Sequence, residues 1–146
     1  MSDSIFGYSL ALIDGDIVIA GAQVVMIAGL PNLAQALQLR VLTPFGSDPI
    51  NVTYGLDVRD AFTEPGNLRM VKDLIRLNLV RTIGTDPRVR DIRSILFQDE
   101  PEYLAQHPEL SADMVRDARR RRAWQVEVII ETIDGTQATV PLVIAL

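Results

Sequence analysis

The chain has 146 residues, 48% of them hydrophobic, which is enough to bury the core of one domain, yet no stretch approaches the roughly 18 uninterrupted apolar residues of a membrane helix. A net charge of −5 argues against a general nucleic-acid binder, and a single histidine with no cysteine excludes multi-histidine and thiolate metal sites. Because the first residues also lack the positive region of a secretory signal, we expect a soluble cytoplasmic domain that inserts into no membrane and holds neither a metal nor a cofactor.

Short β-strands are predicted over residues 8–28. Apolar residues alternate on both sides of Asp14-Gly15, a dipeptide that suits a tight hairpin turn, and the apolar stretch 24–27 can form another strand. The same segment can instead be an extension that becomes ordered only against a partner. We treat residues 1–30 as an N-terminal β extension.

Two helices follow in the pattern of apolar residues. Pro31 suits an early helical position, and helical spacing continues to Thr43, where Pro44 ends the helix. The second helix is predicted from Leu68 to Ile83, with Asn67 as its N-cap. Its apolar face is so wide that we expect this to be the central helix.

Between these helices, Tyr54-Gly55-Leu56-Asp57 closes a connector rich in helix breakers. Gly55 permits a backbone turn, and Asp57 can cap a short helix over 58–62. A turn followed by a cap is one interpretation of Tyr54, Gly55 and Asp57. A direct contact with a partner is the other.

A stiff corner is predicted after the central helix. Gly84 is expected to close that helix in the left-handed conformation, and Pro87 pushes Asp86 toward an extended conformation. We expect Asp86 and Arg88 to point to opposite faces of this segment and therefore not to pair mainly with each other. The corner Asp86-Pro87-Arg88 is then either a brace within the chain or a site where Arg88 binds an acidic group of a partner.

The corner leads into a predicted strand over Val89–Phe97. Residues 99–123 then interrupt the β pattern with a polar helix, for which Ser111 is a candidate N-cap. The run Arg119-Arg120-Arg121-Arg122 closes this insertion. One interpretation is a solvated helix end, since Asp117 lies four residues before the third of these arginines; the alternative is contact with an acidic or nucleic-acid partner.

The C-terminal residues predict a β-hairpin around Asp134-Gly135. Pro141 lies inside the second strand, and a proline cannot donate to a ladder, so this strand is expected at the edge of its sheet. An open apolar edge invites another strand. The residues predicted to form this edge line one face of the strand: Val140, Leu142, Ile144 and Leu146.

The elements together predict an α+β fold, a small mixed or antiparallel sheet packed against two or three helices. Residues 31–146 form the main domain, with a helical insertion at about 99–123. Three motifs stand in order within it: Leu42-Thr43-Pro44-Phe45-Gly46, Tyr54-Gly55-Leu56-Asp57 and Asp86-Pro87-Arg88-Val89.

This order and spacing resemble the baseplate wedge family of contractile phage tails, type VI secretion systems and contractile injection particles, which often carries a lysozyme-like label. The resemblance covers about Pro31 to Phe97 and resumes at Trp124. The family's corner is Glu-Pro-Arg, so Asp86 shortens the acid by one methylene group. The N-terminal extension and the insertion before Trp124 are further departures.

The resemblance implies a structural adaptor, not an enzyme, whose fold is similar to the interlocking domain of the sheath protein. It implies that the adaptor starts sheath assembly by accepting strands from the first sheath ring. The implied partners are the sheath protein, other wedge subunits, and tube or spike-hub proteins, with several copies in a sixfold assembly. Neither a small-molecule substrate nor a nucleic acid is implied.

Two rival functions have less support in the sequence than the adaptor. A glycan hydrolase needs two carboxylates across a cleft, and Glu64 and Glu100 show no spacing that singles out a pair. A nucleic-acid-binding regulator would use Arg119-Arg122, against the acidic net charge.

Overall fold

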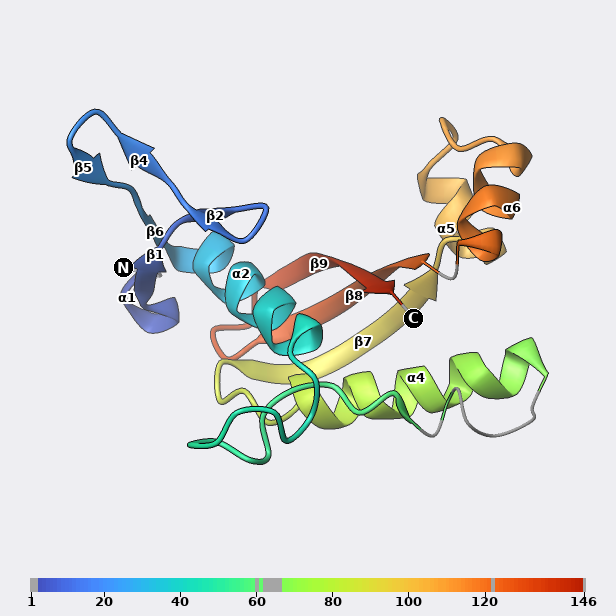
Figure 1. Cartoon of the computed structure of the whole chain (residues 1–146), viewed down its shortest axis with the longest axis horizontal. Coiled ribbons are helices and arrows are strands. Elements are labelled where there is room, and N and C mark those ends of the chain that lie inside the picture. The colour runs from blue at the N-terminus through green and yellow to red at the C-terminus, as the bar shows by residue number, and fades with distance from the viewer. Residues whose placement is uncertain (1–2, 60, 62–66, 122, 146) are drawn as a thin grey trace.

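The computed structural model describes residues 3–59, 61, 67–121 and 123–145. The fold is α+β, and its centre is a three-stranded sheet in the order β7-β8-β9 (Figure 1). Every pair of strands in the described residues is antiparallel, so the sheet is not mixed. The strands of the central sheet are β7 (Val89–Phe97), β8 (Ala123–Thr132) and β9 (Gln137–Ala145).

Two helices share a core with one face of this sheet. They are α2 (Gly29–Leu42) and α4 (Leu68–Ile83), and their buried residues recur at intervals of about four, as helical spacing requires. On β8 every second residue is buried, as expected for one face of a strand. The residues at the centre of this core are Leu33, Leu37, Ile75, Leu79, Ile83, Val126, Val128, Ile130 and Val140.

The central helix begins as predicted and ends differently. Asn67 Oδ1 accepts a hydrogen bond from the Met70 N–H at 2.9 Å, which confirms the N-cap. The left-handed closure expected at Gly84 is wrong, because Gly84 has a right-handed φ of −65°. Its N–H continues the helical pattern by donating to the Val80 carbonyl at 2.9 Å.

Residues 3–28 form an N-terminal lobe that projects beyond the end of α2 (Figure 1). The predicted turn at Asp14-Gly15 joins only one of its three antiparallel strand pairs. The pairs are β1 (Tyr8–Leu10) with β6 (Met26–Ala28), β2 (Leu12–Ile13) with β3 (Asp16–Ile17), and β4 (Ile19–Ala20) with β5 (Gln23–Val24), after the short helix α1 (Asp3–Phe6).

The three strand pairs meet at a cyclic junction of backbone hydrogen bonds. Ala11 donates to Val25 at 2.9 Å, Val18 donates to Ala11 at 3.0 Å, and Val25 donates to Val18 at 2.9 Å. These residues lie seven apart in the sequence. The junction therefore satisfies the backbone groups at the root of all three pairs without a longer sheet.

The predicted helical insertion contains α5 (Pro101–Gln106) and α6 (Ala112–Arg120), at the end of the molecule opposite to the lobe (Figure 1). Ser111 Oγ accepts from the Met114 N–H at 3.2 Å, which confirms the cap. Asp117 and Arg121 form the expected i,i+4 ion pair at 3.0 Å. The side chains of Arg119 and Arg122 lie outside the described residues.

Candidate functional site

The acid-proline-base corner is a tight turn. Val89 donates its N–H to the Asp86 carbonyl at 3.0 Å, which brings residues 86 and 88 to the same side. Asp86 Oδ1 accepts from the backbone N–H and Nε of Arg88 at 3.0 and 2.9 Å, and Oδ2 accepts from Nη2 at 2.8 Å. The expectation that these two residues point to opposite faces is therefore wrong: side chains two residues apart share a face even in an extended segment, and the turn brings this pair into direct contact.

The corner also holds the N-terminal segment. Arg88 Nη1 donates to the Phe6 carbonyl at 3.0 Å, so all three nitrogens of the guanidinium are engaged within the chain. Asn32 Nδ2 donates to the same carbonyl at 2.8 Å. The Phe6 side chain is buried beneath these contacts.

The charges of the corner stabilise each other. Burial raises the pKa of the Asp86 carboxyl, but the hydrogen bonds from Arg88 outweigh it and hold this pKa below its ordinary value. The hydrogen bond to Asp86 in turn raises the pKa of the Arg88 guanidinium. Both groups remain charged at neutral pH.

Gly55 is required by the turn that precedes the central helix. Its φ is +110°, and a Cβ at this position would lie 2.4 Å from the Thr43 carbonyl oxygen. Its own carbonyl accepts from Thr82 Oγ1 at 2.7 Å, which ties the connector to α4. Tyr54 beside it packs under the Arg40 guanidinium, 4.5 Å from the ring centroid.

Asp57 acts on the residues just after the turn. Its Oδ1 accepts from the backbone N–H and the Nε of Arg59, both at 3.3 Å. The hydrogen bond from the Arg59 side chain lowers the pKa of the Asp57 carboxyl. Of the predicted helix over 58–62, Arg59 and Ala61 are helical, and residues 60 and 62 lie outside the described residues.

β9 is an edge strand, as Pro141 predicted, but its apolar face is turned inward. Val140, Leu142 and Ile144 are between 1% and 4% exposed and belong to the core. Leu146 lies outside the described residues. The accessible residues of this strand are those between them, because alternate side chains of a strand point to opposite faces.

The hydrogen-bond pattern shows which backbone groups face the open side of β9. Thr132 donates its N–H to the Thr136 carbonyl at 2.9 Å, so these two residues form a hydrogen-bonded pair of the β8–β9 ladder. In an antiparallel ladder every second pair is hydrogen-bonded, and the pair Glu127–Pro141 is therefore one of the non-bonded pairs. The backbone groups of Thr139, Pro141 and Val143 therefore point outward. Pro141 loses no ladder bond to β8.

Two hollows of about 300 and 310 Å³ flank this edge. Leu42 and Val143 line both, Phe45 lines the first, and Gln38 and Pro141 line the second. Leu42 is 65% exposed, Phe45 41% and Val143 52%, which is high for such large apolar side chains. We call these five residues the β9 groove.

Gln38 partly closes the β9 groove. Its Nε2 donates to the Pro141 carbonyl at 2.9 Å, on the outward side of the strand. Sequence reasoning missed this residue. The available signal was its spacing, since Gln38 and Leu42 are four apart and share one face of α2.

The opposite edge of the sheet is blocked by its own side chains. The outward N–H of Phe97 donates to Glu100 Oε2 at 3.0 Å, and the Ile92 N–H donates to Asp91 Oδ1 at 2.9 Å. β7 also has two register shifts and carries charged residues, which are features that discourage strand pairing. β9 is thus the more open edge of the central sheet.

His107 joins the insertion to the central sheet, and sequence reasoning did not assign it a role. Its Nδ1 lies 3.0 Å from Glu109 Oε1, its Nε2 lies 2.8 Å from Glu127 Oε1, and its ring stacks on Tyr103. Both contacts are hydrogen bonds at once only when both ring nitrogens carry a proton. Hydrogen bonding to Glu109, with a further bond to Glu127, raises the pKa of the imidazole.

The candidate carboxylates of a hydrolase do not form a described pair. Glu100 binds Arg76 and the Phe97 N–H, and Glu64 lies outside the described residues. Among the side chains that the structure describes, no cluster of three His, Asp or Glu residues is arranged to hold a metal ion. In the same part of the chain, no helix has the length and hydropathy to cross a membrane.

No protein-family model matches the chain, and no curated protein matches it either.

Proposed function

We propose that this protein is a structural component of the baseplate of a contractile tail or injection machine. It joins the baseplate to the first sheath ring and starts sheath assembly by accepting a strand along β9. The open edge of β9 beside the β9 groove is the observation that carries this proposal. The three ordered motifs support the baseplate assignment, and the likeness to the interlocking domain of the sheath protein is part of the same proposal.

Strand addition at β9 has a physical basis in the outward backbone groups. Thr139 and Val143 offer both an N–H and a carbonyl to an incoming strand, and main-chain hydrogen bonds of this kind supply affinity. The exposed side chains of Leu42 and Phe45 supply apolar contacts for alternate residues of that strand. Pro141 has no N–H to donate, and its carbonyl already accepts from Gln38. The incoming strand therefore forms its backbone hydrogen bonds with Thr139 and Val143, on either side of Pro141.

The remaining site residues support the sheet that carries this edge. Asp86 and Arg88 hold the N-terminal segment, and Gly55 holds the connector against α4. The sheath protein is the proposed partner of β9. Other wedge subunits and tube or spike-hub proteins bind elsewhere on the surface, with several copies in a sixfold assembly.

Val143→Pro tests this proposal. The Val143 N–H points away from β8, so a proline removes a donor from the open edge without removing a bond of the sheet. We expect the variant to melt close to the wild type, to enter baseplates, and to lose sheath nucleation in an assembly assay followed by electron microscopy. Val143→Thr keeps the donor and should nucleate sheaths normally.

Sheaths of normal frequency with the proline variant would contradict strand addition at β9. Deleting the strand from Thr139 onward is a weaker test, because it also removes Val140, Leu142 and Ile144 from the core. If neither Val143→Pro nor Val143→Thr were found in any contractile particle although both fold, the baseplate assignment itself would be contradicted.

A further inference from the structure

One face of the N-terminal lobe consists entirely of apolar side chains. Across the three strand pairs, Leu10 lies opposite Met26, Leu12 opposite Ile17, and Ile19 opposite Val24, and residues directly opposite share a face. Residues two apart along the chain also share a face, which places the three pairs on one common face and adds Tyr8, two residues before Leu10. We call this set the lobe face: Tyr8, Leu10, Leu12, Ile17, Ile19, Val24 and Met26.

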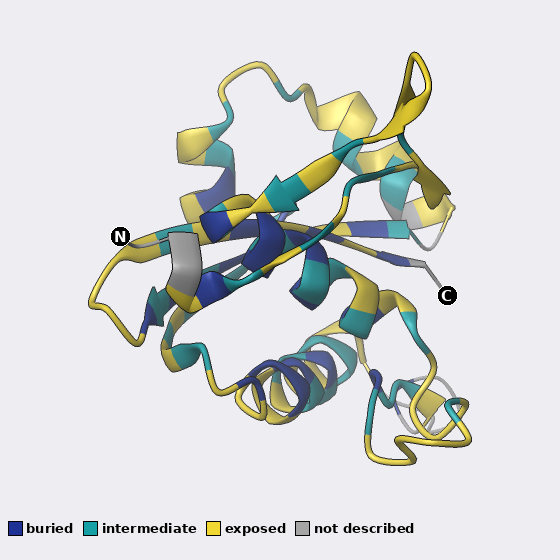
Figure 2. Cartoon of the chain, turned by 90° about the vertical axis from the view of Figure 1, so that its left-hand side faces the viewer, coloured by how far each residue is buried: buried dark blue, intermediate teal, exposed yellow. Residues whose placement is uncertain are grey.

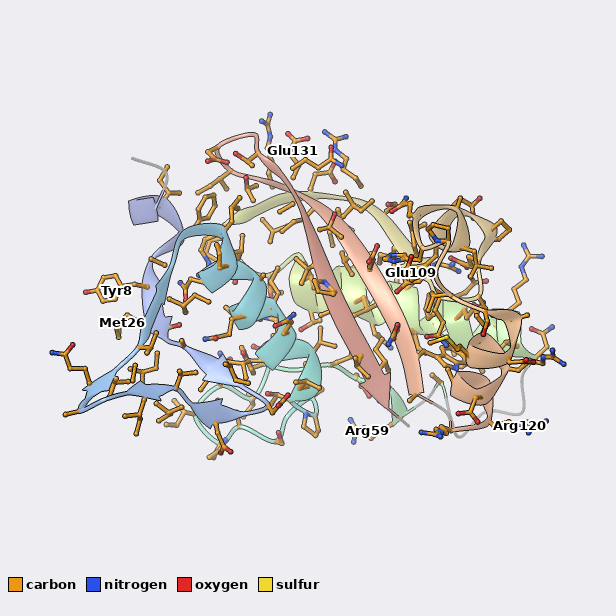
Figure 3. The ribbon with its side chains drawn as sticks, turned by 90° about the horizontal axis from the view of Figure 1, so that it is seen from above. Tyr8, Met26, Arg59, Glu109, Arg120 and Glu131 are labelled. Carbon is orange, nitrogen blue, oxygen red and sulfur yellow. The ribbon has the colours of Figure 1, made fainter. Side chains whose placement is uncertain are left out.

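The lobe face is open to solvent. Six of its seven side chains are between 42% and 77% exposed, and Tyr8 is the most exposed of them. Figure 2 shows the strands of the lobe largely in the colours of exposed and intermediate residues, and Figure 3 shows Tyr8 and Met26 close together at its outer side. An apolar patch of several large side chains is typical of an interaction site.

The lobe is fixed to the body by polar groups on the first turns of α2. Gln35 Nε2 donates to the Leu10 carbonyl at 2.8 Å, and its Oε1 accepts from the Leu12 N–H at 2.9 Å. Ser9 Oγ donates to Asn32 Oδ1 at 2.5 Å. Because Asn32 and Gln35 are themselves buried, the lobe face is held in a defined orientation before any partner binds.

The charged side chains that the structure describes in the lobe are of one sign, and both lie at the end of the strand pair β2–β3. The ionised side chains described in the lobe are Asp14 and Asp16, neither of which has an ion pair in the structure, and the first Lys or Arg of the sequence is Arg40. We propose that the lobe face docks onto a different protein whose apolar surface is bordered by Lys or Arg side chains. This inference does not rest on the function of β9.

The same charges argue against the other occupants. Two copies meeting through this face would bring acidic lobes together with no cation of the lobe to offset them. An anionic lipid surface would repel the lobe for the same reason. A partner with cations around an apolar centre gains both hydrophobic contact and electrostatic steering.

Two labelled amphipathic helical peptides with the same leucine face test this chemistry, one bordered by Lys and one by Glu. We expect the Lys peptide to bind the full-length protein with 1:1 stoichiometry and about tenfold more tightly than the Glu peptide, measured by fluorescence anisotropy. This preference should fall with added salt and should be lost in Asp14→Asn/Asp16→Asn. Equal binding of the two peptides, or no binding of either, would overturn the proposal.

Ile19→Ser/Val24→Ser locates the binding site. Both residues are exposed, so the variant should keep its thermal melt and bind the Lys peptide about tenfold more weakly. The matched control is Leu77→Ser/Val80→Ser on α4, where both side chains are 46% exposed, and it should bind normally. Equal loss in both variants would refute the location. If the protein formed concentration-dependent dimers that Ile19→Ser/Val24→Ser abolished, the proposal would be wrong, because the lobe face would then bind a second copy of this chain.

Discussion

At the scale of single residues, Arg88 connects two parts of the chain that are far apart in sequence. Its side chain neutralises a carboxylate that is 4% exposed and also binds the carbonyl of Phe6, 82 residues away. A lysine offers one nitrogen and cannot make these planar contacts together. The residue type is therefore set by geometry as well as by charge.

Arg88→Ala should destabilise the fold by about 2–3 kcal/mol, because it leaves the Asp86 carboxylate buried without its partner. Urea denaturation at pH 7 measures this. Arg90→Ala, at a side chain that is 65% exposed, is the control and should change the free energy of unfolding by less than about 0.5 kcal/mol.

The pH dependence of this loss follows from the lowered pKa of Asp86. The stability that the Asp86 charge contributes is present above the unfolded pKa of 3.8 and is lost as the pH falls through the lower folded pKa. The difference in free energy of unfolding between the wild type and Arg88→Ala should therefore become smaller at acidic pH. An unchanged melt at pH 7 would show that the corner does not brace the fold and would redirect attention to a partner contact.

At the scale of elements, long periodic segments were predictable and short ones were not. The helix Leu68–Ile83 and the strand Val89–Phe97 have the predicted bounds, because a wide apolar face or a sustained alternation extends over many residues. The two-residue strands of the lobe give no period that a sequence pattern can detect. Their pairing depends on the junction of Ala11, Val18 and Val25, which is a tertiary feature.

The site residues were predictable in position more than in role. Pro141 correctly marks an edge strand. The face of this strand that was predicted to bind a partner is, however, the buried one. Alternation in the sequence distinguishes the two faces of a strand but does not show which of them is buried. The pairing of Asp86 with Arg88 was missed because the two side chains were expected on opposite faces, although residues two apart share a face of an extended chain and the turn at Pro87 brings them closer still. Gly55 was correctly placed in a turn because its positive φ is a local property.

Ile75→Ala tests the central helix as a packing element. Ile75 is fully buried, so the substitution should cost about 2–5 kcal/mol from lost burial and the cavity that remains. Leu77→Ala on the same helix is the control, because this side chain is 46% exposed and should cost much less. Denaturation midpoints for the two variants that coincide would contradict the placement of the core.

At the scale of the whole molecule, His107 forms a titratable joint between the insertion and the central sheet. His107 lies between Glu109 of the insertion and Glu127 of β8, and Glu127 points to the face opposite to α2 and α4 because its neighbours Val126 and Val128 point into the core. The His107 joint thus lies on the face of the sheet opposite to the two main helices, whereas the start of the insertion reaches α4 through the ion pairs Lys72–Asp99 and Arg76–Glu100.

This joint should weaken as the pH rises. Because the pKa of folded His107 is raised above 6.5, the stability it contributes is fully present below 6.5 and is lost as the pH rises through the folded pKa. An NMR titration of the imidazole should give a pKa above 6.5 that falls in Glu127→Gln. His107→Gln should remove the pH dependence of amide exchange in α5. An unshifted imidazole pKa would contradict the double contact.

The cyclic junction at Ala11, Val18 and Val25 has a consequence for how this protein can diverge. The three bonds lie at the inner ends of the strand pairs, and the turns at Asp14-Gly15 and Gly21-Ala22 close the outer ends of two of these pairs. A tip can gain or lose residues in pairs while the roots keep their mutual bonds. The length and shape of the N-terminal lobe can therefore change without a change in the buried core, so the lobe can adapt to different neighbouring proteins.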